Sequence, residues 1–134
     1  MLTNSLLQFI LDWISTHTHY DSSVFNYKII QLSKQEIQMM ACKGKCPIIA
    51  FFKPEVGVLI SKMDFDNLCN QSVLLHEIIH ALQYLNNIEL QNIFKEKEAY
   101  DIQNKFLLDI SKKQELIDYM NVKKCRSLQL NVLM

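Results

Sequence analysis

The sequence predicts an α+β fold, in which a small antiparallel or mixed sheet containing a β-hairpin packs against helices. Two observations lead to this prediction. Apolar residues recur at helical spacing in several segments, and short runs rich in β-branched and aromatic residues, typical of strands, lie between the early ones. At 134 residues and 49% hydrophobic content, the chain can bury a core as one domain spanning residues 1–134.

The first part of the chain is predicted to alternate between helix and strand. Helical spacing of apolar residues predicts a helix over residues 4–15. After a loop, a β-branched run predicts a strand over residues 27–32. Ser33 and Glu36 match a capping box, so a second helix should begin there and end near Gly44.

A β-hairpin is predicted next. Residues 47–52 and 58–61 are two apolar runs of strand length. The segment between them contains Pro54 and Gly57, which favour a turn. These two strands and the earlier one would form the sheet.

The second half of the chain is predicted to be helical. A long apolar helix spans about residues 71–85, with Ser72 near its N-cap, and a second follows over about residues 93–110. The sequence SKKQ at residues 111–114 is a further possible capping box and predicts a short last helix. No clear period is recognisable after Lys123.

Charge and hydropathy exclude some classes of function. Lys+Arg and Asp+Glu both number 14, so the net charge is zero and nothing indicates a nucleic-acid partner. The apolar N-terminus has no basic residue ahead of it and contains Asp12, which does not fit a signal peptide. No run is long enough for a membrane span, so the default expectation is a cytoplasmic protein.

Four cysteines are present: Cys42, Cys46, Cys69 and Cys125. This density is too low for a disulfide scaffold, and without an export signal free thiols are the default expectation. Cys42 and Cys46, four residues apart, could form a metal pair or a disulfide, or pack as small core residues. A place in the core or a disulfide is favoured, because no further metal ligands are obvious nearby.

The long apolar helix carries three ionisable residues in the sequence HEIIH: His76, Glu77 and His80. Residues four apart lie on one face of a helix, one turn apart, so both imidazoles can bind one tetrahedral metal ion. Glu77 lies beside the pair and could reach a water on the metal without being a ligand. This H-E-x-x-H motif is typical of zinc metalloproteases, in which the glutamate is the general base.

A catalytic zinc usually needs a third protein ligand. His17 and His19 lie in the early loop, and Glu89 lies in the break after the motif helix, from which it could not easily fold back. Glu96 and Glu98 are on the next helix, about 200° apart at about 100° per residue, so at most one can face the metal. Glu96 shares the apolar face of that helix and is the preferred ligand, with Glu98 as the fallback.

Three further polar residues lie on the metal-facing side of the two helices. Gln83 and Gln103 could hydrogen-bond the metal ligands, or they could be half-exposed polar residues. Tyr100 could orient a ligand or stabilise an oxyanion, or it could pack with its hydroxyl at the rim of the site.

These motifs resemble the zincin metalloproteases, and among them the gluzincins, whose third zinc ligand is a glutamate on a following helix. HEIIH carries the resemblance, together with EKEAY at residues 96–100, which is similar to the E-x-x-A-D or E-x-x-A-N element of several gluzincins. The last position differs, since Tyr100 stands where that element has an acidic residue or Asn, and Asp101 comes one residue later. Residues 40–108, including CKGKCPIIAFF, are also similar to a family of small bacterial proteins without an assigned activity.

The resemblance implies a minimal zincin-like fold and a zinc-dependent metallopeptidase that cleaves a peptide or protein substrate. The zinc ligands would be His76, His80 and Glu96, with Glu77 as general base. Residues 58–61 would be the edge strand that holds an extended peptide. The alternative is a non-catalytic metal-binding or regulatory domain that keeps the fold; the sequence names neither the substrate nor the oligomeric state.

Overall fold

The computed structural model describes residues 2–44, 46–114 and 119–129 and confirms an α+β fold. A three-stranded sheet is combined with helices. The predicted order of helix, strand, helix, hairpin, helix and helix is confirmed. The elements are α1 (Asn4–His17), the 3-10 turn η1 (Ser22–Val24), β1 (Ile29–Leu32), α2 (Lys34–Cys42), β2 (Ala50–Lys53), β3 (Gly57–Ser61), α3 (Leu68–Leu85), α4 (Asn92–Lys113) and α5 (Val122–Gln129).

The sheet is mixed and has the strand order β1-β3-β2. The predicted hairpin is confirmed, because β2 and β3 pair in antiparallel fashion, while β1 pairs with β3 in parallel. The prediction that residues 58–61 form the edge strand is therefore wrong. β3 is the central strand with all five residues buried, and β1 fills the side that was expected to be open. β2 is the edge next to the hairpin turn.

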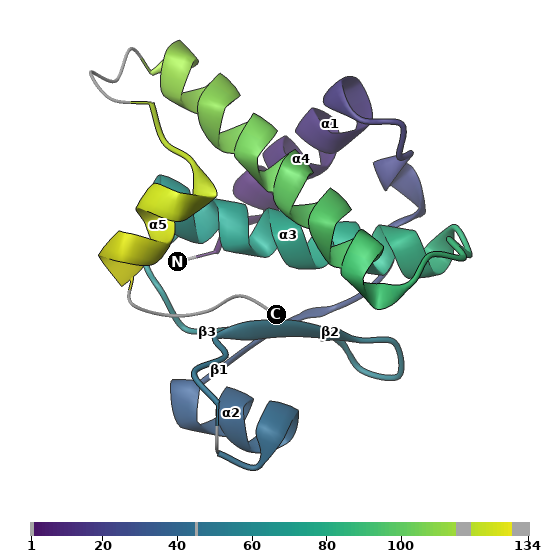
Figure 1. Ribbon diagram of the computed structural model, residues 1–134, viewed down its shortest axis with the longest axis vertical. Coiled ribbons are helices and arrows are strands. Elements are labelled where there is room, and N and C mark those ends of the chain that lie inside the picture. Colours follow the sequence, from purple (N-terminus) through teal and green to yellow (C-terminus); the bar gives the residue numbers. More distant parts are fainter. Residues whose placement is uncertain (1, 45, 115–118, 130–134) are drawn as a thin grey trace.

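The sheet has helices on both faces (Figure 1). Successive strand residues point to opposite faces. Leu59 of β3 accordingly packs with Ile37 of α2 on one face. Its neighbours Val58 and Ile60 belong to the main core on the other face, which is built with α1, α3 and α4. In Figure 1, α2 lies alone below the sheet and the other helices lie above it.

The motif helix α3 begins at Leu68, three residues earlier than predicted. The reason is its N-cap, because the Asn67 side chain accepts a hydrogen bond from the backbone N–H of Asn70. Ser72 lies inside the helix and is fully buried, so it is not near the N-cap as expected. The predicted C-terminus is confirmed at Leu85, and Asn87 follows in the left-handed conformation, with φ 53°.

The capping box predicted at residues 111–114 is wrong, because α4 continues through it to Lys113. Ser111 is buried within α4, and its Oγ accepts the backbone N–H of Met120 instead of capping a new helix. Residues 115–118, where the predicted last helix would continue, lie outside the described residues. A last helix, α5, spans Val122–Gln129 and so extends into the part after Lys123, where the sequence showed no clear period.

Both pairs of cysteines are disulfide-bonded, so the expectation of free thiols is wrong. Cys42–Cys46 closes the end of α2, in agreement with one of the two favoured interpretations. Cys69–Cys125 joins the first turns of α3 to α5 inside a buried cluster with Leu107. This second pairing spans 56 residues and depends on the tertiary fold, so local spacing gave no signal for it.

Among the described residues, no helix is both long enough and apolar enough to cross a membrane.

Candidate metal centre

Three side chains from two helices converge on one point. His76 and His80 lie one turn apart on α3, and their Nε2 atoms are 3.1 Å from each other. Glu96, in the second turn of α4, places Oε1 2.7 Å from Nε2 of His76 and 2.8 Å from Nε2 of His80. In the described part of the chain, His76, His80 and Glu96 form a group of three possible metal ligands, with their ligand atoms within 4.8 Å of one another. We refer to these three side chains as the metal group.

Glu98, the fallback ligand, does not join this group. Its carboxylate accepts hydrogen bonds from the hydroxyl of Tyr20 and from the amide of Gln83. The structure therefore brings Glu96 to the histidines and Glu98 to Tyr20, in the segment after α1. The helical phase that separated the two glutamates in the sequence accounts for this difference.

Gln83 selects the tautomer of the His80 ring. The Gln83 amide nitrogen donates to the carbonyl oxygen of Lys95 at 2.9 Å and to the Glu98 carboxylate at 3.0 Å. Two acceptors thus fix the orientation of the amide, and its oxygen faces Nδ1 of His80 at 2.9 Å. Because that oxygen can only accept, Nδ1 carries the proton, and in the neutral ring Nε2 presents a lone pair.

Gln103 selects the tautomer of the His76 ring in the same way. The Ser72 hydroxyl donates to the carbonyl oxygen of Cys69, so it accepts from the Gln103 amide nitrogen at 3.0 Å. The Gln103 oxygen therefore faces Nδ1 of His76 at 2.9 Å, and Nε2 of His76 is left with its lone pair. All members of this hydrogen-bonded chain between α3 and α4 are buried.

The electrostatics of the three converging atoms favour a cation. Burial lowers the pKa of His76, which favours the neutral ring despite the opposing hydrogen bond with Glu96. Partial burial works to raise the pKa of Glu96, but the hydrogen bonds with His76 and His80 outweigh it and lower the pKa to about 2. Two imidazole Nε2 atoms and one carboxylate oxygen thus face each other, and a metal ion bound there would replace the proton that a hydrogen bond between Nε2 and Oε1 requires. The donor set fits a zinc ion, which takes nitrogen and oxygen ligands in this number.

Glu77 lies beside this group without joining it. Both carboxylate oxygens are buried, and neither has a hydrogen-bond partner within the described structure. Burial, and to a smaller extent the Glu96 carboxylate, raise the pKa of Glu77 well above its ordinary value. A buried and unpartnered carboxylate is costly to stability, and such groups concentrate at functional sites.

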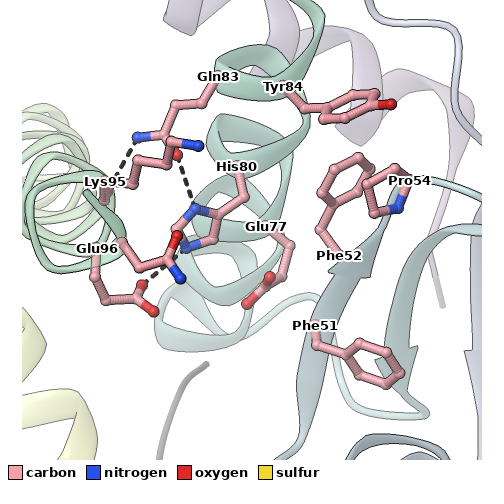
Figure 2. A pocket seen from close by; sticks show the side chains of 10 residues that line it. Phe51, Phe52, Pro54, Glu77, His80, Gln83, Tyr84, Lys95 and Glu96 are labelled. Atoms are coloured by element: carbon pink, nitrogen blue, oxygen red, sulfur yellow. Dashed lines mark hydrogen bonds and ion pairs between the residues drawn. The ribbon is translucent and has the colours of Figure 1, made fainter. Parts of the chain in front are cut away.

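A pocket of about 330 Å³ opens over Glu77, His80 and Glu96. Figure 2 shows Glu77 between the helix that carries His80 and the strand that carries Phe52. The wall opposite the metal group is apolar and comes from Phe51, Phe52, Pro54 and Tyr84, whereas Asn92 and Lys95 of α4 form the polar side. Sequence patterns did not point to Phe51 and Phe52, because apolar residues in a strand look the same whether they face a core or a pocket.

Tyr100 packs against the metal group. Its ring centroid is 4.5 Å from that of His76, and the guanidinium of Arg126 from α5 lies over the tyrosine ring at 4.6 Å. Asp101, the nearest acidic residue to the position where the gluzincin element differs, is exposed and pairs with Lys97 at 2.7 Å. An acceptor for His76 is therefore supplied by Gln103 and not by an acidic residue at position 100 or 101.

Other candidates from the sequence lie away from this site. His17 ends α1, where its Nδ1 is 3.0 Å from the carbonyl oxygen of Trp13 and its Nε2 is 3.6 Å from Asp109. The Cys42–Cys46 disulfide lies at the end of α2, on the opposite face of the sheet from α3.

Comparison with known proteins adds no assignment to this geometry. No family model, curated protein or solved structure matches the chain. The chemistry of the site therefore has to be inferred from its own residues.

Proposed function

We propose that the protein is a zinc-dependent metallopeptidase with His76, His80 and Glu96 as metal ligands. The observation that carries the proposal is the convergence of Nε2 of His76, Nε2 of His80 and a carboxylate oxygen of Glu96, with Nδ1 of each ring facing the side-chain oxygen of a glutamine. Zinc bound there would supply Lewis-acid chemistry at the floor of the pocket.

Glu77 is the proposed general base. It is adjacent to His76 on α3, lines the same pocket and is not engaged by any described donor. A carboxylate in this position can take a proton from an attacking water and pass it to the leaving amine of a peptide bond. Its lack of partners leaves both oxygens available for this transfer.

Strand β2 is the proposed support for the substrate backbone. It is an edge strand, and Phe51 and Phe52 from it line the pocket. An extended peptide can add to an exposed sheet edge through main-chain hydrogen bonds. Residues 58–61, which were expected to hold the peptide, lie in the central strand β3, so β2 is proposed in their place.

A second candidate is a metal-binding domain without catalysis. The complete burial of the Glu77 carboxylate favours it, because a general base must reach a water molecule. In that case the same three ligands would hold zinc, and the pocket would bind a partner without cleaving it.

The test compares the zinc-loaded wild type with the Glu77→Gln variant on a mixture of unstructured peptides, with products identified by mass spectrometry. The metallopeptidase proposal predicts cleavage by the wild type and a loss of about 10²-fold or more in the variant, at unchanged zinc affinity. Glu89→Gln changes an exposed glutamate and serves as the matched control. Zinc binding without cleavage by the wild type would favour the second candidate, and cleavage by Glu77→Gln at the wild-type rate would exclude Glu77 as the base.

A further inference from the structure

Glu98 occupies a position that the metal chemistry does not explain. It lies two residues after Glu96 on α4, yet its carboxylate is not part of the group of possible metal ligands and accepts hydrogen bonds from Tyr20 and Gln83. Tyr20 is buried and belongs to the main hydrophobic core, so it holds the carboxylate from a fixed point in the segment after α1.

Gln83 connects this carboxylate to the metal group. The side chain is 1% exposed, and all of its polar atoms are engaged: the amide nitrogen with Glu98 and Lys95, the oxygen with His80. A reversed amide would place its oxygen against the Lys95 carbonyl and the Glu98 carboxylate, two acceptors that have no proton to donate to it. Glu98 therefore makes the observed orientation the favourable one.

We propose that Glu98 is a positioning residue which acts through Gln83, so that the chain Tyr20–Glu98–Gln83 holds His80 in the tautomer whose Nε2 is free to bind a metal. This inference rests on the metal-binding part of the proposed function and does not depend on catalysis. Glu98 thereby has a role, although its position on α4 keeps it from being a metal ligand itself.

The charge of Glu98 matters less in this role than its acceptor oxygen. A glutamine at position 98 can still accept from both Tyr20 and Gln83 through its carbonyl oxygen, whereas a leucine can accept from neither. Glu98→Gln is therefore the conservative variant, and Glu98→Leu is the variant that breaks the chain. A residue with a merely electrostatic effect on the site would respond to both changes alike.

The experiment is a double-mutant cycle with zinc affinity as the readout. Loss of an outer hydrogen-bond partner of a metal-binding histidine typically weakens affinity about 10–100-fold. We expect Gln83→Leu to weaken zinc binding by about 10-fold or more, and Glu98→Leu by up to about 10-fold. In the Gln83→Leu background, Glu98→Leu should cost less than about 2-fold, because its route to the metal is already removed. Glu98→Gln should stay within about 3-fold of the wild type.

Two outcomes would overturn the proposal. An equal loss from Glu98→Leu in both backgrounds would mean that Glu98 acts independently of Gln83. No loss from Glu98→Leu, with the exposed variant Glu89→Leu as the matched control, would mean that it does not act on the site at all.

A second readout separates this proposal from the proposed function. Nitrogen-15 NMR of the metal-free protein reports which ring nitrogen of His80 carries the proton. The wild type should show the proton on Nδ1, and Gln83→Leu should show a mixture of tautomers. If the wild type binds no zinc, the proposed function fails, and this spectrum still decides the positioning role: an unchanged His80 tautomer in Gln83→Leu would refute it.

Discussion

At the scale of single residues, Glu77 is the described side chain whose buried polar atoms lack a hydrogen-bond partner. Its carboxylate is fully buried and finds no hydrogen-bond donor in the described structure, whereas the neighbouring His76 is held through Nδ1 by Gln103. A polar group buried without a partner costs about 1–3 kcal/mol by mutational measures. This cost suggests that the position is kept for chemistry and not for folding.

Replacing Glu77 should therefore stabilise the metal-free protein. Glu77→Met keeps the length of the side chain without the charge, and we expect its free energy of unfolding to rise by about 1–3 kcal/mol at neutral pH. The folded state raises the pKa of Glu77 above its ordinary value of 4.5, so folding takes up a proton where the unfolded chain has lost it. The wild type is then destabilised as the pH rises above that value, and the advantage of Glu77→Met should grow over the same range.

Urea denaturation of both proteins between acid and neutral pH measures this difference. Glu89→Met, at an exposed position, should shift stability by less than about 0.5 kcal/mol at every pH. A Glu77→Met variant that is less stable than the wild type at neutral pH would show that the buried carboxylate has a stabilising partner after all.

At the scale of elements, the hairpin that carries the pocket wall depends on one glycine. Gly57 begins β3 with φ +137°, and a Cβ there would lie 2.5 Å from the carbonyl oxygen of Lys28. That carbonyl accepts the backbone N–H of Val58 at 3.0 Å, so the parallel pairing of β1 with β3 begins at this close approach.

Gly57→Ala should lower the free energy of unfolding by about 3 kcal/mol, because it adds both backbone strain and a clash with main-chain atoms. Gly44→Ala is the comparison, since Gly44 also has a positive φ but its nearest neighbour is the flexible Met39 side chain at 3.1 Å. We expect about 1 kcal/mol there. Equal losses in the two variants, measured by chemical denaturation, would argue against the close approach of β1 and β3.

Local patterns predicted the elements better than their arrangement. The capping box at Ser33 is confirmed because it involves residues three apart, which the chain itself brings together. The same pattern at Ser111 is wrong because burial of Ser111 in α4 outweighs a weak capping signal. The parallel pairing of β1 with β3 joins residues about thirty positions apart, and nothing in either strand specifies its partner.

In the candidate site, too, the sequence predicted individual residues better than the contacts between distant elements. The spacing of His76 and His80 and the helical phase of Glu96 were sufficient to predict the residues that now converge. Gln83 could be named from its helix face, but its second contact with Glu98 required the packing of α3 against α4. The pocket wall around Phe52 required the sheet order, which the sequence had not specified.

At the scale of the whole molecule, two disulfides constrain the chain very differently. Cys42–Cys46 closes a loop of sequence separation 4, whereas Cys69–Cys125 closes one of 56 and fixes α5 to α3. In the chain-entropy model, stabilisation grows with loop length, to about 4 kcal/mol for the long loop against about 2 kcal/mol for the short one.

Reduction should therefore destabilise the protein chiefly through the long loop. In the Cys42→Ala/Cys46→Ala variant, a reductant should still lower the free energy of unfolding by about 4 kcal/mol. In the Cys69→Ala/Cys125→Ala variant, the reductant should cost only about 2 kcal/mol. Denaturation curves with and without reductant, compared within each variant, cancel the cavity effects of the substitutions. The reverse ranking would contradict a pairing of α3 with α5.

We propose that α3 and α4 together hold one metal ion through His76, His80 and Glu96. The most direct test of this proposal is the metal content of the purified chain by elemental analysis, after reconstitution with zinc and removal of excess metal. We measure the wild type beside His80→Ala and Glu96→Ala, with Glu89→Ala as the exposed control. We expect one zinc per chain in the wild type and the control, and its loss in both ligand variants. A wild type that holds no zinc, or a Glu96→Ala variant that holds as much as the wild type, would contradict it.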